Sequence, residues 1–506
     1  MAALSTDKAV AVIGAGTMGG GIAQVAASAG HTVHLFDAAA GAPERAIATI
    51  AEFLDRAVAK GQMDQTRRTA ILARIKPSRK IEDCAEAMLV IEAVGEDIEI
   101  KRKLFAALEG LVAPAAILAS NTSSLSIAAI ARGLKQPGRV VGMHFFNPAP
   151  VLPLVEVASA PGTASDVSQC VYDTARAWGK LPVHCRSTPG FIVNRCARPF
   201  YGEALRLLGE RASDAATLDA TMREAGGFRM GPFELMDLIG IDVNFAVTKS
   251  LHAAHFGDPR YQPSLLQQEL IEAGNLGRKT GRGFFDYSPG VARPAARSEP
   301  SSAAPTRIRI EGDLGPAEDL VARLTRSGIA HARVDSRDGS GAIVLDDTDL
   351  RLTDGRTASA RATVRRRNLV VFDLALDYGT AKRIAIAAAD QAAPEARKAA
   401  AGFFHMLGFQ VSVIDDTPGL VVMRTVAMLA NEAMEAVQWG VATAADIDLA
   451  MMNGVNYPRG PLAWADAIGP ARVLALVDNL AAHYGEDRYR ASPQLRRLAI
   501  AGKRGA

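Results

Sequence analysis

Residues 9–37 read AVAVIGAGTMGGGIAQVAASAGHTVHLFD. The apolar run at 9–13 lacks polar alternation, which is typical of a parallel strand buried on both faces. Apolar residues at helical spacing follow until Gly30, a residue type that often ends helices. An extended pattern resumes at 32–36 and ends at Asp37. The stretch therefore predicts a strand, a tight turn, a helix, a second strand and an acid.

The predicted turn has the spacing G-x-G-x-x-G. Glycines there permit a tight bend and let backbone N–H groups approach a pyrophosphate, while the helix N-terminus adds partial positive charge. Asp37 can accept hydrogen bonds from ribose hydroxyls, and no arginine follows it to receive a 2′-phosphate. We therefore expect a dinucleotide site, with a plain tight turn as the alternative. The expected dinucleotide is NAD rather than NADP. The turn residues are Gly14, Gly16, Thr17, Met18 and Gly19.

More strands and helices follow in alternation, with a helix expected at 100–111. This order predicts a mostly parallel sheet with helices on both faces, a Rossmann-type domain over 1–186. Residues 42–80 instead show two charged helical segments that are interrupted near 61–64, which predicts an inserted helical hairpin. The expected further strands are 89–93, 117–120, 140–145 and 154–157.

An all-α domain is expected at 187–287, with Thr188 as the N-cap of its first helix and Pro189 at the first helical position. Residues 288–306 are rich in proline, alanine and serine without apolar periodicity, which indicates a linker. The segment 307–414 has short strand-like runs alternating with helical stretches but no glycine-rich turn. Those strands are expected at 308–310, 342–345, 369–372 and 411–414.

An internal repeat links the two halves of the chain. Residues 179–240 match 408–469 at one constant offset and without a gap, for example Glu203 with Glu432. We therefore expect a reduced Rossmann-like domain at 307–414 and a second copy of the all-α domain at 415–506. Because Met423 stands where the first copy has Asn194, the second half is expected to have lost the chemistry.

Length and composition limit the classes of protein. A chain of 506 residues is too long for one core. With 57 basic and 54 acidic residues the net charge is +3, which argues against a nucleic-acid coat or a polybasic membrane anchor. No apolar run reaches the ~20 residues of a membrane span, and no secretion signal opens the sequence, so a cytoplasmic location is expected. No metal site is expected, and Cys84, Cys170, Cys185 and Cys196 are interpreted as reduced core thiols.

His144 ends a predicted strand, and Glu156 lies in the next one beyond a proline-rich turn. Such a bend can return Glu156 to the side of His144, and a carboxylate that fixes the imidazole tautomer makes the ring a proton acceptor near neutral pH. His144 also lies at the carboxyl end of its strand, where ligands bind in open α/β sheets. A satisfied strand-end histidine and a surface carboxylate are the alternatives. The pair predicts an alcohol-oxidising site.

Two more polar residues are expected to hold substrate oxygens. Ser123 follows the predicted strand 117–120, so its hydroxyl is expected to face the same crevice. Its alternative role is an N-cap for a helix that begins near Leu125, although Ser124 is the better candidate for that cap. Asn194 falls within a predicted helix, where asparagine is disfavoured. A structural amide is the alternative, but an amide facing a cleft between domains explains the residue better.

These motifs together resemble the NAD-dependent L-3-hydroxyacyl-CoA dehydrogenase family. The resemblance covers residues 8–287 and rests on segments 14–19, 121–124, 144–148 and 188–195, with Glu156. It implies that His144 takes the 3-hydroxyl proton, that Glu156 orients it, and that Ser123 and Asn194 bind the substrate oxygens. The hydride then leaves for the nicotinamide and gives a 3-oxoacyl thioester.

The resemblance also implies binding residues. The family's cofactor contacts fall on Asp37, Glu96, Lys101, Asn147 and Lys279. Its coenzyme A lysine falls on Lys60 in the predicted hairpin, where positive charge suits the phosphates of coenzyme A. A neighbouring serine of some members is Phe53 here, which makes the coenzyme A contacts less secure.

The second half resembles a bacterial subgroup that appends a reduced Rossmann-like domain and another helical domain. Members act on short or dicarboxylic substrates, including 3-hydroxybutyryl-CoA and the 3-hydroxyadipyl-CoA of phenylacetate breakdown, and the architecture favours the latter. Single-copy members dimerise through the helical domain. We therefore expect the 415–506 copy to pack on the 188–285 copy within one chain, with a homodimer as the alternative.

Two rival functions remain. A dehydrogenase of a free hydroxy acid would need an arginine to clamp the carboxylate, which Arg195 offers, but the Lys60 hairpin would then have no ligand. A non-catalytic nucleotide-binding or structural protein would have lost one of the four site residues, and all four are present.

Overall fold

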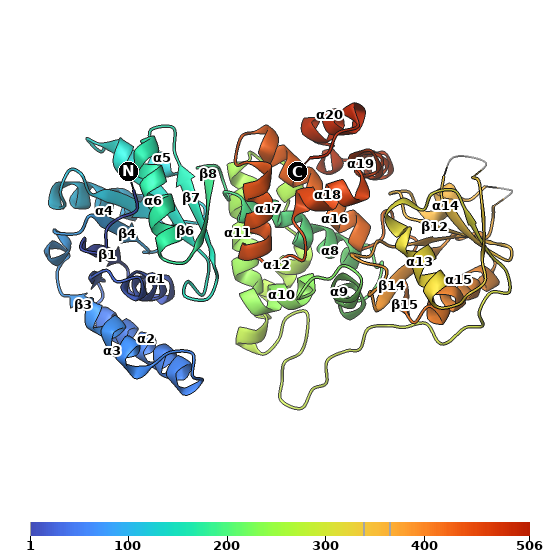
Figure 1. Cartoon of the computed structure of the whole chain (residues 1–506), viewed down its shortest axis with the longest axis horizontal. Coiled ribbons are helices and arrows are strands. Elements are labelled where there is room, and N and C mark those ends of the chain that lie inside the picture. The colour runs from blue at the N-terminus through green and yellow to red at the C-terminus, as the bar shows by residue number, and fades with distance from the viewer. Residues whose placement is uncertain (1, 337–339, 364–365, 506) are drawn as a thin grey trace. The chain divides into compact units, whose positions relative to one another are not determined.

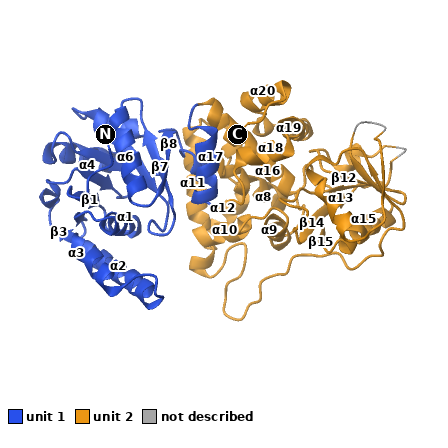
Figure 2. Ribbon diagram, viewed as in Figure 1, with its two compact units in different colours: residues 1–195, 440–455 blue, residues 196–439, 456–506 orange. Residues whose placement is uncertain are grey.

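The computed structural model describes residues 2–336, 340–363 and 366–505. The chain divides into two compact units (Figure 2). The first unit, residues 1–195 and 440–455, holds the glycine-rich turn and the candidate catalytic residues. The second unit, residues 196–439 and 456–505, holds most of both helical copies and the reduced domain (Figure 1).

The first unit is built on an eight-stranded sheet with the order β3-β2-β1-β4-β5-β6-β7-β8. Neighbouring strands are parallel except β6 and β7, which pair antiparallel and place His144 opposite Glu156. The predicted mostly parallel sheet is confirmed. β3 and β8, which lie at the two edges, were not predicted from the sequence. The strands are β1 (Val10–Ile13), β2 (Val33–Phe36), β3 (Ile75–Ser78), β4 (Leu89–Glu92), β5 (Ile117–Ser120), β6 (Val140–Phe145), β7 (Leu154–Ser159) and β8 (Leu181–Arg186).

Helices connect these strands, and the inserted hairpin lies between β2 and β3. The hairpin consists of α2 and α3, which run side by side (Figure 1). Asp64 caps α3 by accepting from the Arg67 amide, and Arg68 pairs with Asp55 across the two helices. The hairpin ends at Arg74 because β3 follows at once. The helices are α1 (Thr17–Ser28), α2 (Ala42–Ala59), α3 (Gln65–Arg74), α4 (Ile98–Leu111), α5 (Ile127–Ala131) and α6 (Ser165–Ala177).

Two predicted helix starts are wrong. α5 is capped by Ser126, which accepts from the Ala129 amide, rather than by Ser124. The first helix after β8 is the short α7 (Val193–Cys196), so Thr188 is not its N-cap. Gly190 and Phe191 have φ values of 76° and 45°, and this left-handed turn delays the helix.

Two copies of one helical arrangement confirm the predicted repeat. α10 and α18 begin and end at matching positions of the repeat, and the left-handed turn at 190–191 recurs at 419–420. The first copy contains α8 (Arg198–Gly209), α9 (Ala215–Glu224), α10 (Pro232–Ile239), α11 (Ile241–Ala254) and α12 (Leu265–Glu272). The second contains α16 (Val422–Gln438), α17 (Ala444–Gly454), α18 (Pro461–Ile468), α19 (Pro470–Tyr484) and α20 (Pro493–Ala501).

The reduced domain is a seven-stranded mixed sheet with the order β10-β9-β11-β12-β13-β14-β15. The register of the repeat also maps β7 onto β14 and α6 onto α15 (Pro394–Met406), so the duplication extends into the α/β part. Residues 288–306 contain no helix or strand. The strands are β9 (Ile308–Glu311), β10 (Ala332–Val334), β11 (Ala342–Leu345), β12 (Thr348–Leu352), β13 (Leu369–Phe372), β14 (Arg383–Ala388) and β15 (Gln410–Val413), with β10, β12 and β14 not foreseen.

The two helical copies pack on each other in the second unit, α8 against α16. Glu203 of α8 is fully buried and accepts hydrogen bonds from Arg424, Arg488 and Tyr489 of the second copy, at 2.8 to 3.1 Å. Glu432, its repeat counterpart, accepts from Tyr261 at 2.5 Å and Arg260 at 3.2 Å. Each copy therefore supplies a buried glutamate that holds an Arg-Tyr pair of the other copy.

Each sheet is also covered by a helix of one copy. In the first unit α17 packs against β7 and β8, and the Arg186 amide donates to the Val441 carbonyl (Figure 2). In the second unit its counterpart α9 packs against β14. The second helical copy therefore completes the fold of the N-terminal domain.

We expect the substitution Glu203→Ala to lower the free energy of unfolding by about 3–5 kcal/mol, because it leaves two arginines buried without their shared carboxylate. Urea unfolding followed by circular dichroism measures the change. Glu486→Ala is the matched control: Glu486 pairs with Arg206 at a partly exposed position, so its loss should cost no more than ~1 kcal/mol. Equal costs for the two variants would contradict a buried cluster at Glu203.

The same cluster gives a pH dependence. Burial disfavours the Glu203 carboxylate, but the charges of Arg488 and Arg424 outweigh burial and hold its pKa at about 2. Because this lies below the usual value of 4.5, the contribution of the charge is complete above about pH 4.5 and is lost as the pH falls through about 2. The difference in the free energy of unfolding between the parent protein and Glu203→Ala should therefore become smaller as the pH falls from about 4.5 to about 2.

Candidate active site

The glycine-rich turn is shaped to receive a pyrophosphate. Gly14 has a φ of +104°, and a Cβ on Gly19 would lie 1.7 Å from the Gly14 carbonyl oxygen, so neither position tolerates a side chain. A Cβ on Gly16 would meet nothing within 4 Å, which leaves open space at the N-terminus of α1. The turn also includes Thr17 and Met18, the first two residues of that helix. These features fit the phosphates of a dinucleotide.

Asp37 follows β2 and fixes the rim of this turn. Its carboxylate accepts from the amide of Ala15 at 2.7 Å and from the amide of Ala39 at 2.8 Å. The acid is therefore held directly beside the glycine-rich turn, where the ribose of a dinucleotide lies in this fold.

A buried ion pair lies between β4 and α4. The Lys101 ammonium contacts Glu92 at 2.5 Å and Glu96 at 3.4 Å. Glu92 also accepts from the Ser120 hydroxyl at 2.6 Å and from the Val94 amide at 2.7 Å. Glu92 was not predicted as a site residue, although an acid at the end of an apolar strand was a signal for it.

Glu96 organises the loop that carries Ser123. Its Oε1 accepts from the Thr122 hydroxyl at 2.6 Å, from the Ser123 and Ser124 amides at 3.1 Å, and from the Ser124 hydroxyl at 2.9 Å. Burial alone would raise the pKa of Glu96, but the Thr122 hydrogen bond and the Lys101 charge outweigh it and lower that pKa. The loop is thus held by a carboxylate that stays ionised.

His144 and Glu156 are both buried and in contact. His144 Nδ1 lies 2.7 Å from Glu156 Oε2, across the antiparallel pair β6 and β7. The rings of Phe146 and Phe191 flank the imidazole, with centroid distances of 4.6 and 5.8 Å. With Nδ1 bound to a carboxylate, the imidazole presents Nε2 as its second nitrogen, which is the geometry of a histidine base.

Glu156 has a second contact that the sequence did not indicate. Its other oxygen, Oε1, accepts from the amides of Ile192 and Val193 at 3.0 and 2.9 Å. These amides open α7, whose second residue is Asn194. One carboxylate therefore fixes both the imidazole and the short helix that carries Asn194.

The turn between β6 and β7 is held by hydrogen bonds from Lys180. The Lys180 ammonium donates to the carbonyls of Ala149 and Leu152 at 2.5 and 2.9 Å. Asn121, from the loop after β5, accepts from the Phe145 amide at 2.8 Å and so joins the ends of β5 and β6. Asn147 lies exposed on this turn.

Two further residues that were expected to contact ligands, Lys60 and Lys279, are exposed. Lys60 is exposed at the C-terminal end of α2 in the hairpin, and Phe53 packs against the core beneath it. Lys279 belongs to the second unit, where its ammonium pairs with Asp242 at 2.6 Å.

The repeat shows what became of this site in the second half. Its register places Asp373 at the position of His144 and Ala385 at that of Glu156. Asp373 is buried and accepts from the amides of Val421, Val422 and Met423, the counterparts of Ile192, Val193 and Asn194. The second half thus keeps a carboxylate that anchors the helix but has no imidazole and no amide side chain there.

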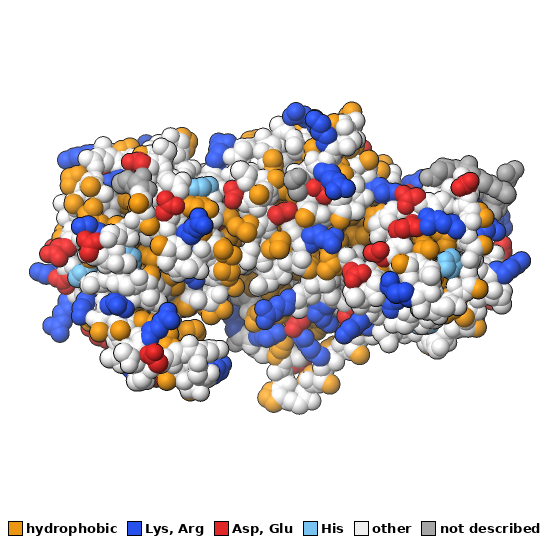
Figure 3. Space-filling model, in the orientation of Figure 1, with side chains coloured by type: hydrophobic (Ala, Val, Ile, Leu, Met, Phe, Trp, Pro, Cys, Tyr) orange, Lys and Arg blue, Asp and Glu red, His pale blue; other side chains and the backbone are white. Residues whose placement is uncertain are grey.

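In the part of the chain that the structure describes, no three histidine, cysteine or acidic side chains gather in a way that could hold a metal ion. None of its helices is both long and apolar enough to cross a bilayer. The four cysteines are buried and free, as predicted. On the face shown in Figure 3 basic and acidic side chains are interspersed.

Comparison with family models covers most of the chain. Residues 9–188 match the NAD binding domain of 3-hydroxyacyl-CoA dehydrogenase, and residues 190–287 and 419–506 both match its C-terminal domain. The chain belongs to the 3-hydroxyacyl-CoA dehydrogenase family. Residues 350–418 match the reduced Rossmann-fold domain of 3-hydroxybutyryl-CoA dehydrogenase. The protein is thus an NAD-dependent oxidoreductase with the duplicated architecture inferred from the sequence.

Some relatives match nearly the whole chain, and others match only its first half. The 3-hydroxyadipyl-CoA dehydrogenase of Escherichia coli is 44% identical over 97% of this chain and 98% of its own. A crystal structure of 3-hydroxybutyryl-CoA dehydrogenase from Escherichia coli has a TM-score of 0.89 and 43% identity, and it covers 99% of both chains. The 3-hydroxybutyryl-CoA dehydrogenase of Clostridioides difficile is 39% identical but matches only 55% of this chain, over 99% of its own.

Proposed function

We propose that this protein oxidises (S)-3-hydroxyadipyl-CoA to the 3-oxoacyl thioester with NAD. The contact between His144 and Glu156 at the carboxyl end of β6 carries the proposal for the chemistry. The substrate follows from the similar 3-hydroxyadipyl-CoA dehydrogenase, which matches this chain along nearly its whole length. This substrate would place the enzyme in phenylacetate breakdown.

His144 is the proposed base. Its Nε2 takes the proton of the 3-hydroxyl group, and Glu156 stabilises the imidazolium that forms. When bound, NAD supplies the acceptor for the hydride that leaves C3. The Ser123 hydroxyl and the Asn194 amide hold the substrate oxygens. The Ser123 segment is held by the Glu96 carboxylate, and the Asn194 segment by the buried Glu156. The product keeps its thioester and gains a ketone at C3.

The ligand contacts are also proposals. We assign Gly14, Gly16, Thr17, Met18 and Gly19 to the pyrophosphate, and Asp37, Glu96, Lys101, Asn147 and Lys279 to the rest of NAD. Lys60 is assigned to a phosphate of coenzyme A, because it is exposed on a hairpin whose helices carry several further basic residues. A cytoplasmic location fits the four free cysteines, since a reducing compartment keeps thiols unpaired.

A panel of thioesters tests the substrate. We expect kcat/KM, measured by NADH absorbance, to be at least about tenfold higher for 3-hydroxyadipyl-CoA than for 3-hydroxybutyryl-CoA, which requires about 1.4 kcal/mol of discrimination. The butyryl thioester is the second candidate because the crystal structure with 99% coverage carries that name. Turnover of free 3-hydroxyadipate at a similar rate would instead support a hydroxy-acid dehydrogenase.

Substitutions at the pair test the mechanism. In Glu156→Gln the carboxamide oxygen can still accept from the Ile192 and Val193 amides, but its NH2 group donates to His144 Nδ1 and forces the proton onto Nε2. The ring can then no longer accept the hydroxyl proton. We expect kcat to fall about 10²- to 10⁴-fold in both Glu156→Gln and His144→Ala, with far-UV circular dichroism unchanged.

The control for these variants is His252→Ala, a half-buried histidine on α11 in the second unit. It should keep the kcat of the parent. The mechanistic assignment is refuted by a His144→Ala enzyme that turns over at the parental rate.

We further propose that the two helical copies replace a homodimer, so that the protein is a monomer. Light scattering across a hundredfold range of concentration should give one constant mass near 53.3 kDa. A fragment that ends at Ser288 should aggregate or dimerise, because α8 loses α16 and the β7–β8 face loses α17. A soluble, stable and monomeric fragment would contradict this proposal.

A further inference from the structure

Two phenyl rings pack against the imidazole of the proposed base. The centroid of the Phe146 ring lies 4.6 Å from that of His144 with the ring planes at 57°, and the Phe191 ring lies 5.8 Å away at 61°. Tilted and edge-to-face arrangements at such distances are favourable for aromatic rings. Phe191 is fully buried and Phe146 is half-buried. The imidazole is therefore held by aromatic contacts as well as by its hydrogen bond to Glu156.

The repeat shows that the two rings accompany the imidazole. In the second half, where the imidazole is missing, Ala375 stands at the position of Phe146 and Leu420 at that of Phe191. Both replacements are buried. Phe191 and Leu420 also share a left-handed backbone conformation, with φ values of 45° and 53°. The fold thus keeps this turn in both halves, but it does not need an aromatic side chain at either position.

Each ring is carried by a backbone segment that hydrogen bonds hold in place. The amide of the residue after Phe191 donates to Glu156 Oε1 at 3.0 Å. The amide of the residue before Phe146 donates to Asn121 Oδ1 at 2.8 Å. Because the other oxygen of Glu156 contacts His144 Nδ1, one carboxylate places both the imidazole and the Phe191 segment. The two rings therefore reach the imidazole from fixed backbone positions.

A hydrogen bond at one nitrogen does not by itself fix the plane of an imidazole. The χ2 torsion of histidine has a broad energy minimum, so the His144 ring can rock while Nδ1 keeps its contact with Glu156. Rocking about that contact moves Nε2, the nitrogen that takes the proton. A displacement of about 1 Å at a reacting group can cost roughly 10²-fold in rate, and packing by neighbouring side chains is what limits it.

We propose that Phe146 and Phe191 are positioning residues for His144. Their rings restrict the tilt of the imidazole, so that Nε2 stays directed at the 3-hydroxyl group of the substrate. This inference rests on the proposed role of His144 as the base. It also accounts for the second half, which has neither ring at the positions where it has no imidazole to orient.

Substitution by the residues of the second half tests the proposal, because the same fold already accepts them there. We expect kcat of the full-length enzyme, measured with the better of the two candidate thioesters, to fall about 10- to 100-fold in Phe146→Ala and in Phe191→Leu. The KM of the thioester and the Kd of NAD should stay within about twofold of the parent values. Deuterium at C3 of the substrate should slow both variants more than the parent, because the chemical step then limits turnover.

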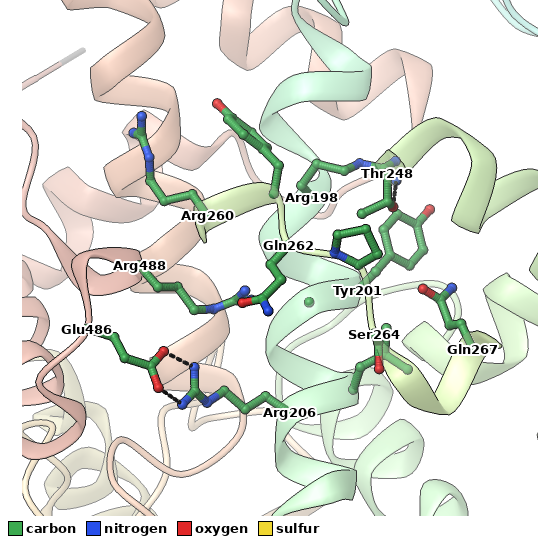
Figure 4. A pocket seen from close by; sticks show the side chains of 14 residues that line it. Arg198, Tyr201, Arg206, Thr248, Arg260, Gln262, Ser264, Gln267, Glu486 and Arg488 are labelled. Atoms are coloured by element: carbon green, nitrogen blue, oxygen red, sulfur yellow. Dashed lines mark hydrogen bonds and ion pairs between the residues drawn. The ribbon is translucent and has the colours of Figure 1, made fainter. Parts of the chain in front are cut away.

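Two further variants separate positioning from general packing. Phe146→Tyr keeps an aromatic ring and should keep kcat within about threefold of the parent. Phe200→Leu is the matched control, since Phe200 is as buried as Phe191 and its counterpart in the repeat is Leu429. It should lower the Tm about as much as Phe191→Leu and leave kcat unchanged. Phe200 lies on α8, the helix that in Figure 4 carries the labelled side chains of Arg198, Tyr201 and Arg206.

Three outcomes would overturn the proposal. The first is a parental kcat in both Phe146→Ala and Phe191→Leu. The second is a Kd of NAD that rises in Phe146→Ala while kcat is unchanged, which would assign that ring to the cofactor. The third is an equal loss of kcat in Phe200→Leu, which would make the effect one of packing alone. None of these results bears on His144 as the base, which His144→Ala tests separately.

Discussion

The buried carboxylate of Glu156 is the constraint on which the first unit's site depends. One of its oxygens holds the imidazole of His144, and the other holds the first amides of α7. A deeply buried charge is stable only when its lone pairs have hydrogen-bond partners. The Glu156 carboxylate therefore cannot move toward one neighbour without breaking its hydrogen bond to the other. The distance between the proposed base and the proposed amide ligand is thereby fixed by a single residue.

The second half of the chain keeps the contact that anchors the helix but not the contact with an imidazole. Asp373 occupies the position of His144 yet makes the backbone contacts that Glu156 makes in the first half. Burial raises the pKa of Asp373 to about 6 despite four backbone donors, and this cost is retained where no histidine accompanies the carboxylate. Anchoring the helix is therefore a requirement of the fold, and the imidazole is the addition that gives chemistry.

Local patterns predicted much of this structure, and long-range contacts accounted for the failures. The central strands were visible because they are apolar throughout, whereas β3 contains Pro77 and exposed Lys76, and β8 begins with exposed Leu181. The cap of α5 and the start of α7 were misplaced because Glu96 draws Ser124 away and a left-handed turn precedes Val193. The pairing of His144 with Glu156 was foreseeable from a hairpin, but Glu92 and the second contact of Glu156 depend on partners distant in sequence.

Fusing two copies of one helical domain changes which substitutions evolution can use. Identical subunits related by a twofold axis must carry every replacement twice, so a change that suits one side is imposed on the other. Within a single chain the constraint disappears, and position 202 can lose a side chain while position 431 keeps one. Because the two copies are covalently linked, their sequences can diverge and the interface between them can become asymmetric, which identical subunits do not allow.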